Sequence, residues 1–568
     1  MKNRNYWVVS PNVKNNDEEN RWKEFLSNNP YSFIGWDENN QYGNAFINKI
    51  KKGDVIINSQ RKNWNPHVFG IGIVSNDKCE WKEIENTPSG AYCRQLNPYL
   101  TKERVSKLKL EFDGTTYYGD NKQIPALYQL HPQRNENDNR LVEIIEKELE
   151  MVRKEQDIQK FVELLKTNKN IIFTGAPGTG KTYLAKEIAK QMIGVKTDEE
   201  MEDSGQFDFV QFHPSYDYTD FVEGLRPTPP DENGIIGFEI KDGIFKSFCE
   251  KALENLIDSE KTPDEIQSES NIVSILANFL ADSIENGKKF DYNNNSNQFV
   301  IVPHSEKKEC FYAKILNNES MERQLVFKKD TIEVLKRADD VKKPTDIQKV
   351  FNTRFKYQYT FIFLILEQLR DKLKKKAEEP KIKINKKDFI FVIDEINRGE
   401  ISKIFGELFF SIDPSYRGKK GAVKTQYSNL HNDEKEVFYV PENVFIIGSM
   451  NDIDRSVESF DFAMRRRFTW VEISAEQSAN NMNLPQDIKE RLLKLNKQIS
   501  NTEGLNSSYH IGAAYFLDSN GNPRQDIDDI WNLRIEPLLR EYLRGMPDSI
   551  EKKIEPLKNA LLHNENNG

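Results

Sequence analysis

The segment 171–182, Ile-Ile-Phe-Thr-Gly-Ala-Pro-Gly-Thr-Gly-Lys-Thr, constrains the fold of this chain more than any other part. It reads as an apolar strand, a glycine-rich turn and the start of a helix, and the turn matches the pattern G-x-x-x-x-G-K-[ST]. Glycines let backbone N–H groups curl around an anion, and the following helix adds its N-terminal dipole. The pattern predicts an α/β P-loop domain that binds and hydrolyses a nucleoside triphosphate.

The residues of this loop have separate expected roles. Lys181 is expected to reach the β- and γ-phosphates, and the Thr182 hydroxyl is expected to hold Mg²⁺. The predicted phosphate-binding set comprises Gly175, Gly178, Thr179, Gly180, Lys181 and Thr182.

Length, charge and cysteine usage narrow the class of protein. A chain of 568 residues is too long for one core, so three or four domains are expected. The formal net charge of −9 excludes a uniformly basic nucleic-acid-binding protein, so any DNA contact must be local. No signal-type segment follows the N-terminus, and the longest apolar run, 361–366, is too short to cross a bilayer. The four cysteines show no CxxC spacing and are expected to be reduced thiols of a cytoplasmic protein without membrane contact: Cys79, Cys93, Cys249 and Cys310.

Composition changes along the chain and predicts the domain boundaries. Residues 1–130 alternate short β-rich runs with turns and hold five of the seven tryptophans, which favours a small β-barrel. Residues 131–158 read as a polar linker and a helix, followed by a second helix at about 158–165. The nucleotide core is expected at 159–480, with an insertion at about 253–350 and a helix near 359–376 that returns to the core. Residues 481–568 are expected to form a helical lid.

A second strand ends in paired acids. Residues 389–395 begin with five apolar residues, starting at Phe389, and end with Asp394 and Glu395. This is a Walker B pattern. Asp394 is expected to support Mg²⁺, and Glu395 is expected to orient or deprotonate the attacking water.

A third apolar strand, 444–449, leads to Asn451, whose amide can bridge the γ-phosphate and the lytic water. Beyond it, Arg466 and Arg467 follow an expected helix. Consecutive arginines there can project into a neighbouring subunit and neutralise charge in the transition state, the arginine-finger device, although a structural or DNA-facing basic cluster is the alternative.

The order of these motifs resembles the AAA+ ATPases, which implies an α/β core, a helical lid and a ring, most often a hexamer. Four segments resemble the McrB family in particular: 211–227, 243–249, 394–399 and 450–456. That family supplies the GTP-hydrolysing motor of McrBC modification-dependent restriction systems. The resemblance implies Mg²⁺ as cofactor, double-stranded DNA with a modified base as ligand, and a McrC-like nuclease subunit as partner.

The same resemblance implies roles for further residues. Asn451 would be the sensor, Asp454 with Arg455 the signature pair, and Arg466 or Arg467 the finger. The chain departs from the family pattern at two places. Asp452 stands where the family usually has Thr, and residues 509–516 replace a Gly-His-Ser-Tyr-Phe segment.

The N-terminal segments 6–11, 32–36, 52–56 and 70–74 resemble EVE domains of the PUA-like and YTH-related group. That resemblance implies a pocket for a modified or flipped base, in which aromatic walls stack on the base. Trp36 and Trp64 are the expected walls, and Asn12 and Asn65 the expected donors or acceptors to the base edge. Ordinary core packing is the alternative role for both tryptophans.

The residues leave the nucleotide base and the exact function open. The segment 385–388 matches the NKxD guanine motif but precedes the Walker B strand, so GTP rests on the resemblance and ATP stays possible. No nuclease centre is recognisable, since Glu239 and Lys241 form an isolated E-x-K. The leading hypothesis is a motor that reads modified DNA and activates a separate nuclease. The alternatives are a GTP-timed binding switch without translocation and an AAA+ remodeller of protein complexes.

Overall fold

The computed structural model describes most of the chain, and its contacts divide into two compact units. The described residues are 4–10, 30–35, 38–60, 67–82, 91–108, 110, 112, 127–229, 236–292, 297–304, 309–316, 323–373, 383–431, 437–453, 462–482, 484–546 and 549–562. The first unit comprises Met1–Glu200, Ser449–Arg455 and Phe468–Gly568, and the second comprises Met201–Gly448 and Ser456–Arg467. No helix in the described ranges is long and apolar enough to cross a membrane.

The N-terminal part of the first unit is a seven-stranded sheet of half-barrel form, which confirms the predicted small β domain. Its order is β2-β6-β4-β3-β1-β7, with β5 added to β6. The strands are β1 (Tyr6–Val9), β2 (Tyr31–Ile34), β3 (Val55–Gln60), β4 (His67–Val74), β5 (Glu80–Lys82), β6 (Ala91–Leu100) and β7 (Leu127–Leu130), accompanied by helices α2 (Gln41–Asn48) and α3 (Lys102–Ser106).

Alternate residues of these strands enter two different cores, as the period of two in a strand requires. Tyr6 and Val8 of β1 pack in one core, whereas Trp7 and Val9 pack in the other. The indole of Trp7 donates to the buried Asp54 carboxylate at 3.1 Å. This tryptophan is therefore a core residue.

One continuous helix, α4 (Glu136–Asn168), replaces the predicted linker and two shorter helices. Asn135 caps it by accepting from the N–H groups of Asn137 and Asp138. Val142, Ile145, Leu149 and Val152 bury one stripe of the helix against the N-terminal sheet. The polar stretch between the two apolar patterns consists largely of good helix formers, so the helix runs through it.

The first unit continues with the P-loop strand and the lid. Strand β8 (Asn170–Thr174) pairs in parallel with β18 (Thr469–Glu472), and α5 (Lys181–Ile193) follows the loop. The predicted helical lid packs around Trp531, which is fully buried. Its helices are α16 (Ala475–Asn481), α17 (Gln486–Asn501), α18 (Ile527–Ile530), α19 (Glu536–Tyr542) and α20 (Ile550–Leu562).

The second unit holds the Walker B strand β16 (Phe389–Asp394) between two parallel neighbours, β17 (Val444–Ser449) and β9 (Phe207–Gln211). The strand is buried over its first five residues, and only Asp394 at its carboxyl end is half-buried. The elements around these strands are α6 (Asp198–Asp203, at the boundary between the units), α7 (Tyr218–Phe221), the hairpin β10 (Glu223–Pro227) and β11 (Phe238–Asp242), α8 (Ile244–Glu260), α13 (Ile401–Phe405), α14 (Leu408–Ser411) and α15 (Phe462–Arg467).

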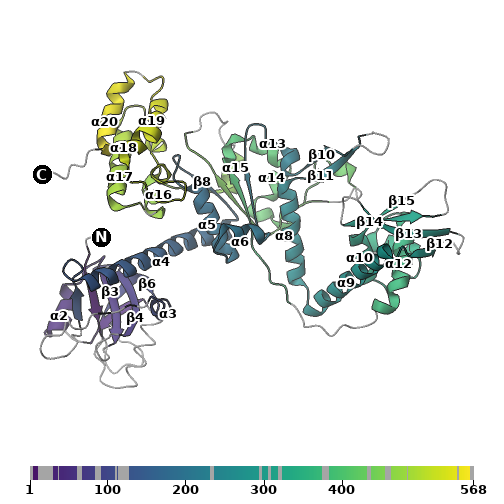
Figure 1. The fold of residues 1–568 in the computed structure, drawn as a ribbon, viewed down its shortest axis with the longest axis horizontal. Coiled ribbons are helices and arrows are strands. Elements are labelled where there is room, and N and C mark those ends of the chain that lie inside the picture. The colour runs from purple at the N-terminus through teal and green to yellow at the C-terminus, as the bar shows by residue number, and fades with distance from the viewer. Residues whose placement is uncertain are drawn as a thin grey trace. The chain divides into compact units, whose positions relative to one another are not determined.

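The expected insertion is a folded layer of helices on a sheet, and it is larger than 253–350. Its antiparallel sheet has the order β12-β13-β14-β15. Its own core runs from Ile272 to Leu369, so the helix expected to return to the nucleotide core belongs to the insertion instead. The elements are α9 (Pro263–Glu285), β12 (Lys289–Tyr292), β13 (Asn297–Pro303), β14 (Cys310–Ile315), β15 (Arg323–Phe327), α10 (Lys328–Lys336), α11 (Ile347–Phe351) and α12 (Gln358–Leu373) (Figure 1).

Candidate nucleotide site

The P-loop turns sharply between β8 and α5 because two of its glycines adopt left-handed backbone conformations. Gly178 has φ 75° and Gly180 has φ 80°, a region that side-chain-bearing residues rarely occupy. Gly180 is also the residue that precedes the first turn of α5. The free N–H groups of that turn are therefore available to an anion, as the sequence pattern predicts.

Lys181 is buried and lies at the centre of this loop. Its ammonium group donates to the carbonyl oxygens of Ala176 at 2.9 Å and Gly175 at 3.1 Å. It also donates to Oδ1 of Asn451 at 2.9 Å, across 270 residues of sequence. Asn451 is held there because the preceding N–H, of Met450, donates to the carbonyl of Phe173 on β8. The structure thus brings together the predicted phosphate-binding lysine and the predicted sensor.

Asp452 places a carboxylate beside the same lysine. Burial raises its pKa, and the positive charge of Lys181 opposes that rise. Its backbone N–H donates to the Gly175 carbonyl at 3.3 Å. The residue that departs from the family pattern therefore sits where it repels phosphate whenever it is ionised.

Asp452→Asn is expected to tighten nucleotide binding by about fivefold at pH 7.5, since a like charge at contact distance costs about 1 kcal/mol in a solvated site. Burial raises the pKa of Asp452. As pH rises through that pKa, the side chain becomes a carboxylate that repels phosphate, so the nucleotide affinity of the unmodified protein should fall. The Asn variant should lack this decline. Titration with a fluorescent nucleotide between pH 5 and 8 checks both; equal affinity and equal pH dependence in the two proteins would contradict the prediction.

The Walker B acids stand at the end of β16 in the second unit. Glu395 has φ 50°, an uncommon and strained conformation for a glutamate. Its carboxylate lies 3.3 Å from the Arg398 guanidinium, measured between Oε2 and Nε. Such strained residues cluster at functional sites because the backbone aims one side chain. Thr182 and Asp394 offer hard oxygen ligands, the donor type that Mg²⁺ prefers.

The consecutive arginines of α15 have different surroundings. The Arg466 side chain is 72% exposed and lies 3.4 Å from the Asp413 carboxylate. The Arg467 guanidinium stacks 4.3 Å above the Phe409 ring. Burial opposes ionisation of Asp413, but hydrogen bonds from Ser415 and the two arginine charges together hold its pKa below the usual range. Of the two candidates, Arg466 is the one whose side chain extends into solvent.

A cavity of about 210 Å³ beside the P-loop was not apparent from sequence. Its lining is mainly apolar, with the ring of Tyr183 and the side chains of Ile158 and Met482 among its walls. The residues around it are Met151, Lys154, Glu155, Ile158, Thr179, Gly180, Tyr183, Leu184, Glu187, Asn481 and Met482. Its mainly apolar lining suits a flat apolar ring adjoining the phosphate loop.

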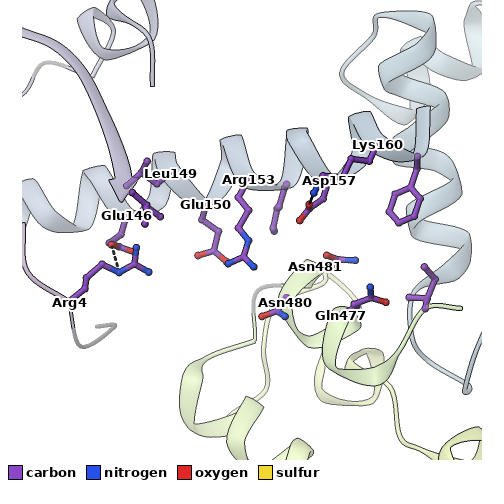
Figure 2. Close-up of a pocket in the computed structure, with 14 residues that line it drawn as sticks. Arg4, Glu146, Leu149, Glu150, Arg153, Asp157, Lys160, Gln477, Asn480 and Asn481 are labelled. Carbon is purple, nitrogen blue, oxygen red and sulfur yellow. Dashed lines mark hydrogen bonds and ion pairs between the residues drawn. The ribbon is translucent and has the colours of Figure 1, made fainter. Parts of the chain in front are cut away.

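A second cavity, of about 340 Å³, lies between α4 and α16. Figure 2 shows Glu150, Arg153 and Asp157 of α4 on one side and the amides of α16 on the other. Arg4 forms an ion pair with Glu146 at its edge, at 3.4 Å. With alternating charges along its wall, this cavity suits water and ions better than a base.

The lid rests directly on the P-loop through the segment that departs from the family pattern. The N–H groups of Gly512 and Ala514 donate to the carbonyls of Pro177 and Gly178 at 3.1 and 3.0 Å. The Tyr515 ring lies against Gly178, so closely that a Cβ there would come within 2.7 Å of it. His510 turns away to a hydrogen bond with Ser500 at 2.7 Å, and burial lowers its pKa.

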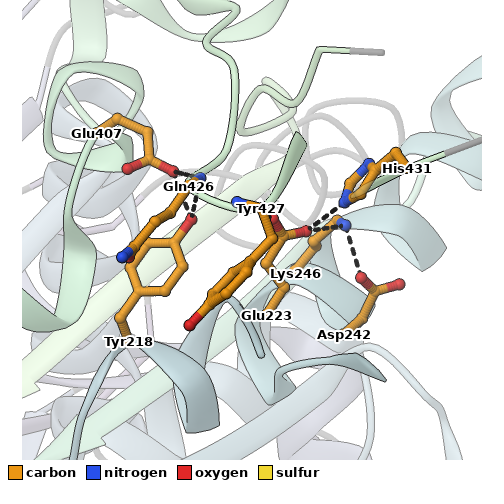
Figure 3. Close-up of polar contacts among 8 residues, drawn as sticks. All are labelled: Tyr218, Glu223, Asp242, Lys246, Glu407, Gln426, Tyr427 and His431. Carbon is orange, nitrogen blue, oxygen red and sulfur yellow. Dashed lines mark hydrogen bonds and ion pairs between the residues drawn. The ribbon is translucent and has the colours of Figure 1, made fainter. Parts of the chain in front are cut away.

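A buried ion network lies under the hairpin of the second unit (Figure 3). The Glu223 carboxylate is fully buried and accepts from Lys246 at 2.7 Å, and it lies 3.0 Å from Nε2 of His431. Lys246 also pairs with Asp242 at 2.6 Å. Burial alone would raise the pKa of Glu223, but hydrogen bonds from Lys246 and Thr425 outweigh it and keep the pKa low. The network therefore joins the hairpin and the helix α8 that follows it to the 425–431 loop, which is distant in sequence.

Comparison with known proteins identifies the type of module. Residues 339–468 match the family described as AAA domain (dynein-related subfamily), and residues 487–551 match the family described as McrB, alpha-helical lid domain. The chain carries an McrB-type AAA+ module. The predicted family resemblance is thereby confirmed for the nucleotide core and lid.

Two curated relatives extend the comparison. The chain is 27% identical over 414 residues to the type IV methyl-directed restriction enzyme EcoKMcrB subunit of Escherichia coli strain K12. That alignment covers 70% of this chain and 59% of the relative's length. It is also 29% identical over 96 residues to the type II restriction enzyme BsuMI component YdiS of Bacillus subtilis strain 168, covering 16% of this chain and 28% of that protein.

Several predicted site residues lie outside the described ranges: Asn12, Trp36, Trp64, Asn65, Asp454 and Arg455. The EVE assignment and its base pocket therefore remain predictions. Of the N-terminal tryptophans that the structure describes, Trp7 is a core residue, whereas Trp81 is half exposed at the sheet surface and packs edge-on against Tyr92.

Proposed function

We propose that this chain is the nucleotide-hydrolysing motor and DNA-recognition subunit of a modification-dependent restriction endonuclease in the cytoplasm. The observation that carries the proposal is the McrB-type lid segment, hydrogen-bonded to a P-loop whose lysine meets the Asn451 sensor. Both curated relatives are named as parts of restriction enzymes, which supports the proposed role in restriction. GTP is the favoured substrate, ATP the alternative, and Mg²⁺ the cofactor.

The chemical roles follow from residue type and position. Lys181 neutralises the β- and γ-phosphates, while Thr182 and Asp394 hold the metal. Glu395 orients or deprotonates the water, and Asn451 bridges that water and the γ-phosphate. Arg466, the more exposed of the two arginines, acts in the site of a neighbouring copy. This role requires a ring of subunits, and a hexamer is the usual ring of AAA+ assemblies.

DNA cleavage belongs to a separate, McrC-like nuclease subunit. Across the β10–β11 hairpin Glu239 is opposite Arg226 and Lys241 is opposite Gly224, so the facing strand contributes no second acid to this E-x-K pair. Double-stranded DNA with a modified base is recognised by the N-terminal domain, where Trp36 and Trp64 form the walls of the pocket and Asn12 and Asn65 bind the base edge.

The test is hydrolysis by the purified protein with GTP and ATP in parallel, with and without the nuclease subunit and methylated duplex DNA. Preferential GTP turnover, increased by the partner, is expected, and Glu395→Gln should bind nucleotide without turnover. Trp36→Ala or Trp64→Ala should remove the preference for methylated DNA and spare basal hydrolysis. ATP turnover indifferent to partner and DNA would instead favour a remodeller of protein complexes.

A further inference from the structure

The sheet of the inserted domain has one covered and one open face. Helices α9, α10 and α12 pack on the covered face (Figure 1). Phe299 and Ile301 of β13 and Phe311 and Ala313 of β14 are buried beneath these helices. Because side chains alternate along a strand, the residues between them lie on the opposite face.

A row of basic residues crosses this open face. Lys289, Val300, Lys314 and Arg323 are successive cross-strand partners on β12, β13, β14 and β15. Lys289 and Arg323 are exposed, and Lys314 is half-buried. Neighbouring strands are about 4.8 Å apart, so the row extends over about 14 Å.

This row is electrostatically unfavourable without a ligand. Lys314 and Arg323 lie directly opposite each other, and like charges in that relation destabilise a sheet. Within the described part of the chain, no ion pair is formed by Lys289, Lys314 or Arg323. Asp291 is an acid on the same face of β12, two residues from Lys289, and it accepts a hydrogen bond from Gln298 at 2.8 Å. The chain as a whole has a net charge of −9, so the basic row is a local feature that anions would neutralise.

An aromatic and apolar row runs beside the basic one. Val302, Tyr312 and Leu325 are cross-strand partners two residues along from it, hence about 7 Å away. The half-buried Tyr312 ring stacks on His304 with a centroid distance of 5.0 Å and an interplanar angle of 17°. A strand of nucleic acid presents the same pair of features, a charged backbone and a flat apolar base.

We propose that the open face of the inserted sheet binds single-stranded nucleic acid. The phosphates lie along Lys289, Lys314 and Arg323, and unpaired bases pack against Tyr312 and its neighbours. Basic grooves lined by aromatic side chains bind single strands in this way, and stacking requires bases that are not already paired. This contact is separate from the recognition of a modified base and from nucleotide hydrolysis.

The proposal is tested by fluorescence anisotropy of the full-length protein with unmodified 20-nucleotide single-stranded DNA and RNA and with the duplex. Lys314→Glu combined with Arg323→Glu is expected to weaken single-strand binding at least tenfold. It should also make the slope of log K against log salt about 1.4 less steep, since each lost phosphate contact removes about 0.7. Tyr312→Ala should weaken binding about fivefold or more with the salt slope unchanged.

The matched control is Lys349→Glu with Arg354→Glu, which makes the same charge change on the helical side of the domain and should leave binding within twofold. Circular dichroism and basal nucleotide hydrolysis should be unaltered in all variants. The proposal would be overturned if the control pair weakened binding as much as the test pair. It would also be overturned if the duplex bound as tightly as the single strand and Tyr312→Ala left binding unchanged. A failure of partner-stimulated GTP hydrolysis would instead count against the proposed restriction function alone.

Discussion

Lys246→Met is expected to lower the free energy of unfolding of the second unit by about 3–5 kcal/mol, because it leaves the fully buried Glu223 carboxylate without its cation. Asp242 loses the same partner, but it is partly exposed and water can solvate it. Chemical denaturation followed by intrinsic fluorescence measures the loss. Lys251→Met, an exposed position on the same helix α8, is the control and should cost less than about 0.5 kcal/mol.

A second variant distinguishes an unpaired charge from lost packing. Adding Glu223→Gln to Lys246→Met removes the charge and should restore part of the stability. The low pKa of Glu223 also fixes the pH response. A carboxyl group with a depressed folded pKa stabilises the protein above its unfolded pKa, and that contribution disappears as pH falls through the folded pKa. If the single and double variants were equally unstable at pH 7, the ion-pair explanation would be wrong.

Gly512→Val is expected to reduce nucleotide hydrolysis at subsaturating substrate by about tenfold to a hundredfold. A Cβ at this position would come within 2.1 Å of the Gly178 backbone carbon and 2.4 Å of the Thr179 nitrogen. Backbone atoms cannot move aside as a flexible side chain can, so the lid segment must separate from the P-loop. Overpacking of this kind costs about 1–3 kcal/mol, and each 1.4 kcal/mol in binding is about tenfold.

The matched control for this variant is Gly521→Asn in the same lid. Gly521 has a left-handed φ of 77°, which asparagine tolerates, and open space around its Cβ position. The control should retain normal hydrolysis. Nucleotide affinity and the thermal unfolding midpoint should be measured for both proteins. A Val variant with unchanged affinity and turnover would show that contact between lid and P-loop is not needed for catalysis.

Local motifs were the part of the molecule that sequence predicted well. The P-loop, the strand before it, the Walker B strand and the individual strands of the N-terminal domain all depend on residues close together in the chain. Glycines at positions with φ above zero, and apolar runs that end in acids, are compatible with few other local structures. Lys181 and Asn451 were both identified from such patterns, and the structure joins them directly.

Contacts between distant segments could not be predicted in the same way. Nothing in the sequence around His431 indicates that its ring meets Glu223, 208 residues away. The Gly512 segment was recognised only as a departure from a family pattern, whereas the structure shows it hydrogen-bonded to the P-loop. The end of the insertion was missed because Tyr359 and Phe361 look like core residues of any domain, and only tertiary packing assigns them to one.

The single helix α4 has a mechanical consequence. Thirty-three residues at 1.5 Å each make a rod about 50 Å long, with no proline or glycine at which it could hinge. One end is fixed in the core of the N-terminal sheet, and near the other Phe161 packs edge-on against Phe173 of the P-loop strand. A tilt of about 5° at the nucleotide end would carry the far end by about 4 Å. A helix without a hinge therefore transmits a small rotation beside the P-loop strand as a displacement of several ångströms at the N-terminal sheet.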